Sequence, residues 1–93
     1  MLSLYTPYDL QVELSQFVRR TRKDKKVSVK TLSLKSGVPD STIRKFESTG
    51  DISLRQFLML YAELGDLSKM KNLTKQEDTP KSIDEVIASN VKL

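Results

Sequence analysis

The 93-residue chain contains no cysteine, no histidine and no tryptophan. Without cysteine there is no disulfide framework and no thiolate metal site. Without histidine there is no imidazole base, which excludes Ser–His and Cys–His nucleophile arrangements. Glycine and proline are scarce, at three each, and no apolar run reaches the roughly 18 residues of a membrane helix. We therefore expect a small cytoplasmic domain that is not an enzyme and binds no cofactor or metal.

Charge is unevenly distributed along the chain. The net charge is +4, but residues 1–50 carry +5 and residues 51–93 carry −1. A basic cluster of this kind attracts phosphate backbones through counterion release, although a solvated helix face has the same composition. The excess is concentrated in Arg19, Arg20, Arg22, Lys23, Lys25, Lys26 and Lys30.

Helix start and stop signals divide the first fifty residues into three helices. Thr6 can cap the first, with Pro7 at its first position, and this helix ends within residues 23–26. Ser28 can cap the second, which ends at Gly37, and the third covers about 40–48. The positions expected to face the core are Leu10, Leu14, Phe17, Val18, Thr21, Leu32, Ile43 and Phe46.

Two further helices and a polar tail follow. Ser53 opens a Ser-Leu-Arg-Gln capping box, and the helix after it ends at Gly65. Asp66 can cap a fifth helix. Residues 74–93 are typical of a polar linker and a flexible tail with a possible short helix around Ile83, Val86 and Ile87. The apolar positions of the fourth and fifth helices are Leu54, Phe57, Leu58, Tyr61, Leu64, Leu67, Met70 and Leu73, while Met59 and Leu60 suit either the core or a dimer interface.

Residues 27–47 have the plan of a DNA-binding helix-turn-helix. Leu32 anchors the first helix, Gly37 permits a turn with positive φ, and Val38 fills the corner. Ile43 and Phe46 dock the second helix, whose polar side suits the major groove. The candidate base-reading residues are Asp40, Ser41, Thr42, Arg44 and Lys45.

Asp40 has two possible roles, because a carboxylate can accept from cytosine N4 or cap a helix. Other polar residues flank the motif where helix starts and turns meet phosphates. The candidate phosphate contacts are Ser28, Lys30, Ser48, Thr49 and Arg55. Each of these residues is equally compatible with an ordinary solvated surface.

The pattern Leu-Ser-x-x-x-Leu-x-x-x-Ser-Gly-Val-x-x-Ser-Thr-Ile-x-x-x-Glu, with Val27 at its first position, resembles the Cro/C1 or XRE-type helix-turn-helix repressors. The resemblance covers roughly residues 8–73. Within that family, residues 4–7, 43–54 and 80–86 are similar to HipB-type antitoxins of two-part HipBA and three-part HipBST modules.

This resemblance implies an all-α, five-helix, lambda-repressor-like domain in residues 1–73. It also implies a homodimer that binds palindromic double-stranded operator DNA, represses its own operon in the bacterial cytoplasm, and binds a HipA-like kinase toxin or a small accessory subunit. Arg22 and Glu47 match a pair that, in the family, bridges the first helix and the recognition helix.

Two departures from the family pattern keep other functions open. Pro39 replaces a Ser or Thr that many relatives carry, so Asp40 could take over part of the capping, and Val29 replaces a Gln. One alternative is a phage-type repressor without a toxin partner. The other is a protein-only adaptor that has lost DNA binding.

Overall fold

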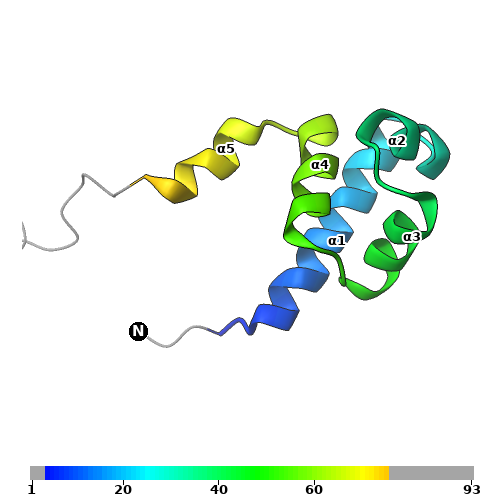
Figure 1. Ribbon diagram of the computed structural model, residues 1–93. Helices are drawn as coiled ribbons and strands as arrows, with labels where there is room; N and C mark the ends of the chain where they lie inside the picture. The colour runs from blue at the N-terminus through cyan, green and yellow to red at the C-terminus, as the bar shows by residue number, and fades with distance from the viewer. Residues whose placement is uncertain (1–3, 76–93) are drawn as a thin grey trace, which may run out of the picture.

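The computed structural model describes residues 4–75, which contain five α-helices and no strand (Figure 1). The predicted all-α class is therefore confirmed for this range. The short helix expected around residues 82–87 lies outside the described residues, as does the segment 80–86. The helices are α1 (Pro7–Asp24), α2 (Val29–Ser36), α3 (Asp40–Thr49), α4 (Leu54–Leu64) and α5 (Leu67–Lys71), followed by the 3-10 helix η1 (Asn72–Thr74).

Side-chain caps set most helix starts. The Thr6 hydroxyl accepts from the Asp9 N–H at 3.0 Å, and the Asp9 carboxylate accepts from the Thr6 N–H at 3.2 Å, which is a reciprocal capping box. Ser53 also caps its helix by accepting from the Gln56 N–H at 3.1 Å. The capping box predicted at Ser53 differs from the usual one, because the Gln56 amide oxygen accepts from the Ser53 hydroxyl, at 3.2 Å, and not from the Ser53 backbone N–H.

The core lies where α1 and α2 each pack against both α3 and α4. Phe46 of α3 meets Phe57 of α4 edge to face, with ring centroids 5.9 Å apart. Leu60 is completely buried, so it belongs to the core and cannot form a dimer interface. The buried apolar residues are Val18, Val29, Leu32, Val38, Ile43, Phe46, Phe57, Leu60 and Leu64.

The apolar stripe predicted for α1 faces the core except at Leu10, because Leu14 and Phe17 pack against the core beside the buried Val18. Leu10 is 51% exposed, whereas Ser15, Val18 and Arg22 are buried. The spacing of Ser15, Val18 and Arg22 is helical, so the buried face of α1 includes two polar positions beside the apolar stripe. The polar Ser15 is tolerated because its hydroxyl donates to the Val12 carbonyl oxygen at 2.7 Å.

Not all the apolar residues of α4, α5 and η1 are buried. Leu54, Leu67 and Leu73 are 71%, 44% and 78% exposed, so these apolar positions lie outside the core. Leu54 starts α4, and α5 has only five residues, of which Met70 packs against the core. None of the helices within residues 4–75 is both long and apolar enough to cross a membrane.

Candidate nucleic-acid interface

The turn between α2 and α3 is built as the sequence predicts. Gly37 has a φ of 83°, in the left-handed region that favours glycine, and its N–H donates to the Ser33 carbonyl oxygen. Val38 follows with its side chain completely buried, while its N–H donates to the Ser36 hydroxyl at 3.1 Å. The turn therefore fixes the direction in which α3 leaves α2.

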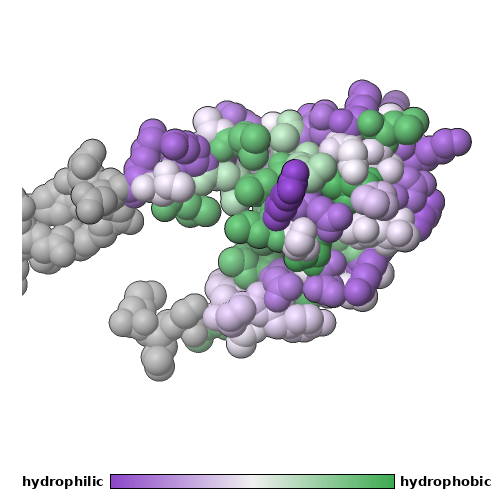
Figure 2. Space-filling view, viewed as in Figure 1, coloured by the Kyte–Doolittle hydropathy of each residue, from purple (hydrophilic) through white to green (hydrophobic). Residues whose placement is uncertain are grey.

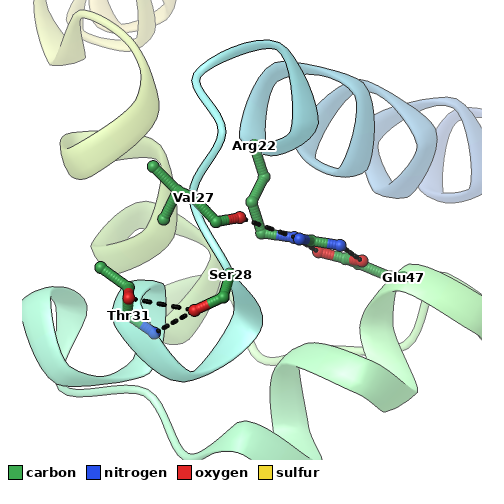
Figure 3. A network of polar contacts seen from close by, with 5 residues as sticks. All are labelled: Arg22, Val27, Ser28, Thr31 and Glu47. Carbon is green, nitrogen blue, oxygen red and sulfur yellow. Dashed lines mark hydrogen bonds and ion pairs between the residues drawn. The ribbon is translucent and has the colours of Figure 1, made fainter.

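A nearly buried ion pair attaches α3 to the end of α1 (Figure 3). Arg22 donates from two nitrogens to the two carboxylate oxygens of Glu47, each at 2.8 Å. A third guanidinium nitrogen donates to the Val27 carbonyl oxygen at 2.9 Å. The side chains of Arg22 and Glu47 are only 11% and 8% exposed, so the predicted contact between them is present and well shielded from water.

Electrostatics favours the charged form of Arg22. The hydrogen bond to Glu47 raises the pKa of the Arg22 guanidinium, and partial burial opposes this shift without reversing it. Arg22 is therefore a cation throughout the physiological range. Within residues 4–75, no buried side-chain nitrogen or oxygen lacks a hydrogen-bond partner.

The five candidate base-reading residues do not share one environment. Three of them, Ser41, Arg44 and Lys45, are exposed on α3, whereas Asp40 and Thr42 are half-buried. Lys45 pairs with Asp51 at 3.2 Å, but both side chains are about two-thirds exposed. A pair this exposed is weak, so Lys45 can exchange Asp51 for another acceptor at little cost.

Asp40 does not cap α3, so the capping role considered for it is wrong. Pro39 is the N-cap residue and makes no side-chain capping bond. Its carbonyl oxygen instead accepts from the Thr42 and Ile43 N–H groups at 3.0 and 3.1 Å. The Asp40 carboxylate thus remains a first-turn charge at the leading end of the helix.

The candidate phosphate contacts fall into two groups. Ser28, Lys30 and Arg55 are exposed, and Ser28 also caps α2 by accepting from the Thr31 N–H at 3.0 Å. The hydroxyls of Ser48 and Thr49 both donate to the Lys45 carbonyl oxygen, at 3.2 and 2.7 Å. These two hydroxyls must give up a bond at the end of α3 before they can donate to a phosphate.

An open hollow of about 250 Å³ lies beside the ion pair and brings Arg19 of α1 together with Arg44 of α3. Ser48 and Val29 complete its lining, with Arg22 and Glu47. Because Glu47 is already bound to Arg22, the hollow presents two exposed guanidinium groups to an anion. Planar guanidinium groups match the oxygens of a phosphate.

Arg19 is the residue that the sequence-based choice of site residues missed. It belongs to the basic cluster, and that cluster was the available signal, but nothing in the linear spacing pairs it with Arg44. Arg19 also lines a second hollow with Gln16, Arg20 and Lys23, farther along the outer side of α1. The positive surface therefore continues from α3 onto α1.

No protein family, curated protein or solved structure matches the chain. Within the described residues, no group of three or more acidic side chains is placed to hold a metal ion.

Proposed function

We propose that this protein is a sequence-specific DNA-binding repressor of the Cro/C1 helix-turn-helix type. The observation that carries the proposal is the presentation of α3. Its buried side is docked by Ile43 and Phe46, its start is fixed by the Gly37 turn, and its outer side presents Ser41 and Lys45 to solvent. A short helix held in this manner fits the major groove, where side chains can reach base edges.

The charge around α3 supports nucleic acid as the ligand. Arg44 meets Arg19 in the hollow beside the ion pair, and Lys30 and Arg55 are exposed on α2 and α4. Cations on several helices around one recognition helix are suited to contacting the phosphates that flank a groove. Two copies acting together would read a palindromic site, one half-site each.

The decisive experiment is DNA binding at several salt concentrations. The full chain should bind a DNA fragment from its own promoter more tightly than a scrambled fragment of equal length. If about six phosphates are contacted, the logarithm of the affinity should fall with a slope of about −5 against the logarithm of the salt concentration. A salt-independent signal, or equal affinity for both fragments, would overturn the proposal.

We further propose that the protein is a HipB-like antitoxin that represses its own operon and binds a HipA-like kinase toxin or an accessory subunit. The similarity of residues 43–54 to HipB-type antitoxins supports this assignment. That segment forms most of α3, the turn at Gly50 and the start of α4. Co-purification with the product of a neighbouring kinase-like gene tests it. A locus without such a gene would favour a phage-type repressor.

One observation favours the protein-only adaptor as a second candidate. The Asp40 carboxylate stands at the leading end of α3 without a capping role, where it repels an approaching phosphate. Val29 gives no such support, because it is buried in the core, where an apolar side chain is suitable. If the adaptor is correct, Asp40→Asn will not produce DNA binding. If the repressor is correct, the same change should raise non-specific affinity.

A further inference from the structure

The surface over α3 and the turn that follows it consists mainly of hydrophilic or weakly polar side chains (Figure 2). Polar and charged contacts must therefore set which DNA this surface accepts. Residues 40–53 contain three acidic side chains. Glu47 is engaged in the ion pair with α1, and Asp40 lies at the leading end of α3. The third, Asp51, lies in the turn after α3, where its carboxylate is 3.2 Å from the Lys45 ammonium.

Several contacts fix the backbone at Asp51. Its N–H donates to the Thr49 hydroxyl at 3.1 Å, and that hydroxyl donates to the Lys45 carbonyl oxygen at 2.7 Å. Gly50 is buried in the left-handed conformation, and its carbonyl oxygen accepts from the Gln11 side chain at 3.1 Å. Asp51 is therefore attached to the part of α3 that carries Lys45, and the contact between their side chains starts from a fixed backbone.

The Lys45 side chain needs such a guide if it is to read a base. Lysine carries its charge on a flexible four-carbon stem, and as a point charge it pairs with a phosphate of any sequence. Its ammonium has three N–H groups, so contact with one carboxylate leaves donors for a base. In the major groove a lysine can donate to O6 and N7 of a guanine.

The Asp51 carboxylate acts on an approaching phosphate in the opposite sense. It is 66% exposed, so a phosphate that reaches toward Lys45 from this side meets a like charge. The edge of a base carries no net charge and meets no such repulsion. The carboxylate therefore disfavours the sequence-independent partner of Lys45 and leaves the sequence-dependent partner accessible.

We propose that Asp51 is a specificity-determining residue, which positions Lys45 to read a guanine in the major groove. This role rests on the proposed function, because it has meaning only in a protein that reads DNA. The weakness of the exposed pair suits the role, since the carboxylate directs the ammonium without preventing it from reaching the base. Asp51 acts through Lys45 and is a positioning residue.

The test measures the affinity of the full chain for its promoter fragment and for copies in which each base pair is replaced in turn. Asp51→Asn removes the charge and keeps the shape of the side chain. We expect it to relax the preference at one G·C pair by about three- to fivefold, at the position that Lys45→Ala also affects. Affinity for a scrambled fragment should rise and its salt slope should steepen by about 1, because the released Lys45 contacts one more phosphate.

The double variant Lys45→Ala/Asp51→Asn shows whether Asp51 acts through Lys45. Once Lys45 is removed, Asp51→Asn should change the base preference no further. Glu63→Gln is the matched control, because it removes the same charge from an exposed residue of α4 and should leave the preference unchanged. Asp51→Glu keeps the charge and should restore at least part of the preference. Circular dichroism verifies that each variant is folded.

The proposal is overturned if Asp51→Asn keeps the wild-type preference at every position, or weakens it equally at all positions. It is also overturned if the relaxed position is not a G·C pair, or if Asp51→Asn has the same effect with and without Lys45. Failure of the proposed function gives a different result, because the wild type itself then fails to distinguish its promoter from the scrambled fragment. A wild type that discriminates beside an unchanged Asp51→Asn variant refutes the positioning role and leaves the repressor intact.

Discussion

The ion pair between Arg22 and Glu47 should contribute strongly to the coupling between α1 and α3. We expect Arg22→Met and Glu47→Leu each to lower the free energy of unfolding by about 3 kcal/mol, because each leaves a nearly buried charge without its main partner. In a domain of this size that corresponds to a fall of roughly 10–20 °C in Tm. Arg22→Met should be the more damaging change, since it also removes the bond to the Val27 carbonyl oxygen.

The double variant Arg22→Met/Glu47→Leu measures how much of each single loss comes from the unpaired charge left behind. With both charges replaced by apolar side chains, no uncompensated charge remains, so the double variant should lose clearly less than the sum of the two single losses. Urea denaturation followed by circular dichroism measures all four proteins, and it suits a chain without tryptophan. Losses that add to within about 0.5 kcal/mol would refute the reasoning.

The exposed pair of Lys45 and Asp51 is the matched control for this cycle. Its side chains are 64% and 66% exposed, against 11% and 8% for Arg22 and Glu47. The Lys45–Asp51 coupling should stay below about 1 kcal/mol and disappear in 1 M salt. The Arg22–Glu47 coupling should persist in the same salt, because a pair with little exposed surface is screened much less than an exposed one.

Lys45→Ala should relax base preference at one operator position, at a cost of about 1–3 kcal/mol in a competition assay. Arg55→Ala should instead weaken binding to all DNA sequences about equally. A Lys45→Ala variant with unchanged preference would exclude base reading by Lys45. Hydrogen bonds from Ser68 lower the pKa of the Asp66 carboxyl group. The stabilisation that Asp66 gives α5 by capping is therefore present above the ordinary aspartate pKa, and it is lost as the pH falls through the lowered pKa of Asp66. The protection factors of the α5 amides, which are corrected for the intrinsic pH dependence of exchange, should therefore fall in acid. They should fall less in Asp66→Asn, which caps without titrating, and equal responses of the two proteins would contradict this. Gly37→Ala should lower the free energy of unfolding by about 1–2 kcal/mol in urea titrations, because the φ of 83° at this position is unfavourable for a residue with a Cβ. An unchanged urea midpoint would show that the turn can adopt another backbone conformation.

Helix boundaries were predictable from the sequence because local bonds determine them. Thr6 and Ser28 cap the helices expected of them, and Gly37 ends α2 in the left-handed conformation. These interactions join residues that are two to four positions apart, so a linear pattern contains both partners. The core positions Ile43 and Phe46 were predictable for a similar reason, since helical spacing places them on one face.

Burial at the helix ends was not predictable, because it depends on which neighbour is long enough to cover a given turn. Leu10 and Leu54 each lie in an early turn of their helix and remain largely exposed. The spacing of Leu67, Met70 and Leu73 is helical, but α5 is followed by η1 and meets the rest of the molecule mainly through α4. Periodicity identifies one face of a helix and contains no information about what covers it.

The candidate site was predictable only in part, for a related reason. The contact between Arg22 and Glu47 came from the resemblance to a family, because 25 residues separate the partners and nothing local connects them. The meeting of Arg19 with Arg44 depends on how α1 crosses α3, which no spacing rule provides. Asp40 is the converse case: its residue type suits a cap, but the Pro39 carbonyl oxygen already accepts from the N–H groups near it.

The polar contacts that attach α3 to α1 lie at the C-terminal end of α3. Besides the ion pair at Glu47, the Gln11 side chain donates to the Gly50 carbonyl oxygen at 3.1 Å, and a Cβ on Gly50 would lie 3.2 Å from the Gln11 backbone. The ten-residue helix is about 15 Å long, so these contacts hold it at the end far from Ser41 and the Gly37 turn holds it at the other. A tilt of only about 10° about either end would move the opposite end by roughly 2.5 Å, which is enough to break hydrogen bonds to base edges. Small changes at Gln11 or Gly50, remote from any base, should thus alter which sequence is read before they alter whether DNA is bound.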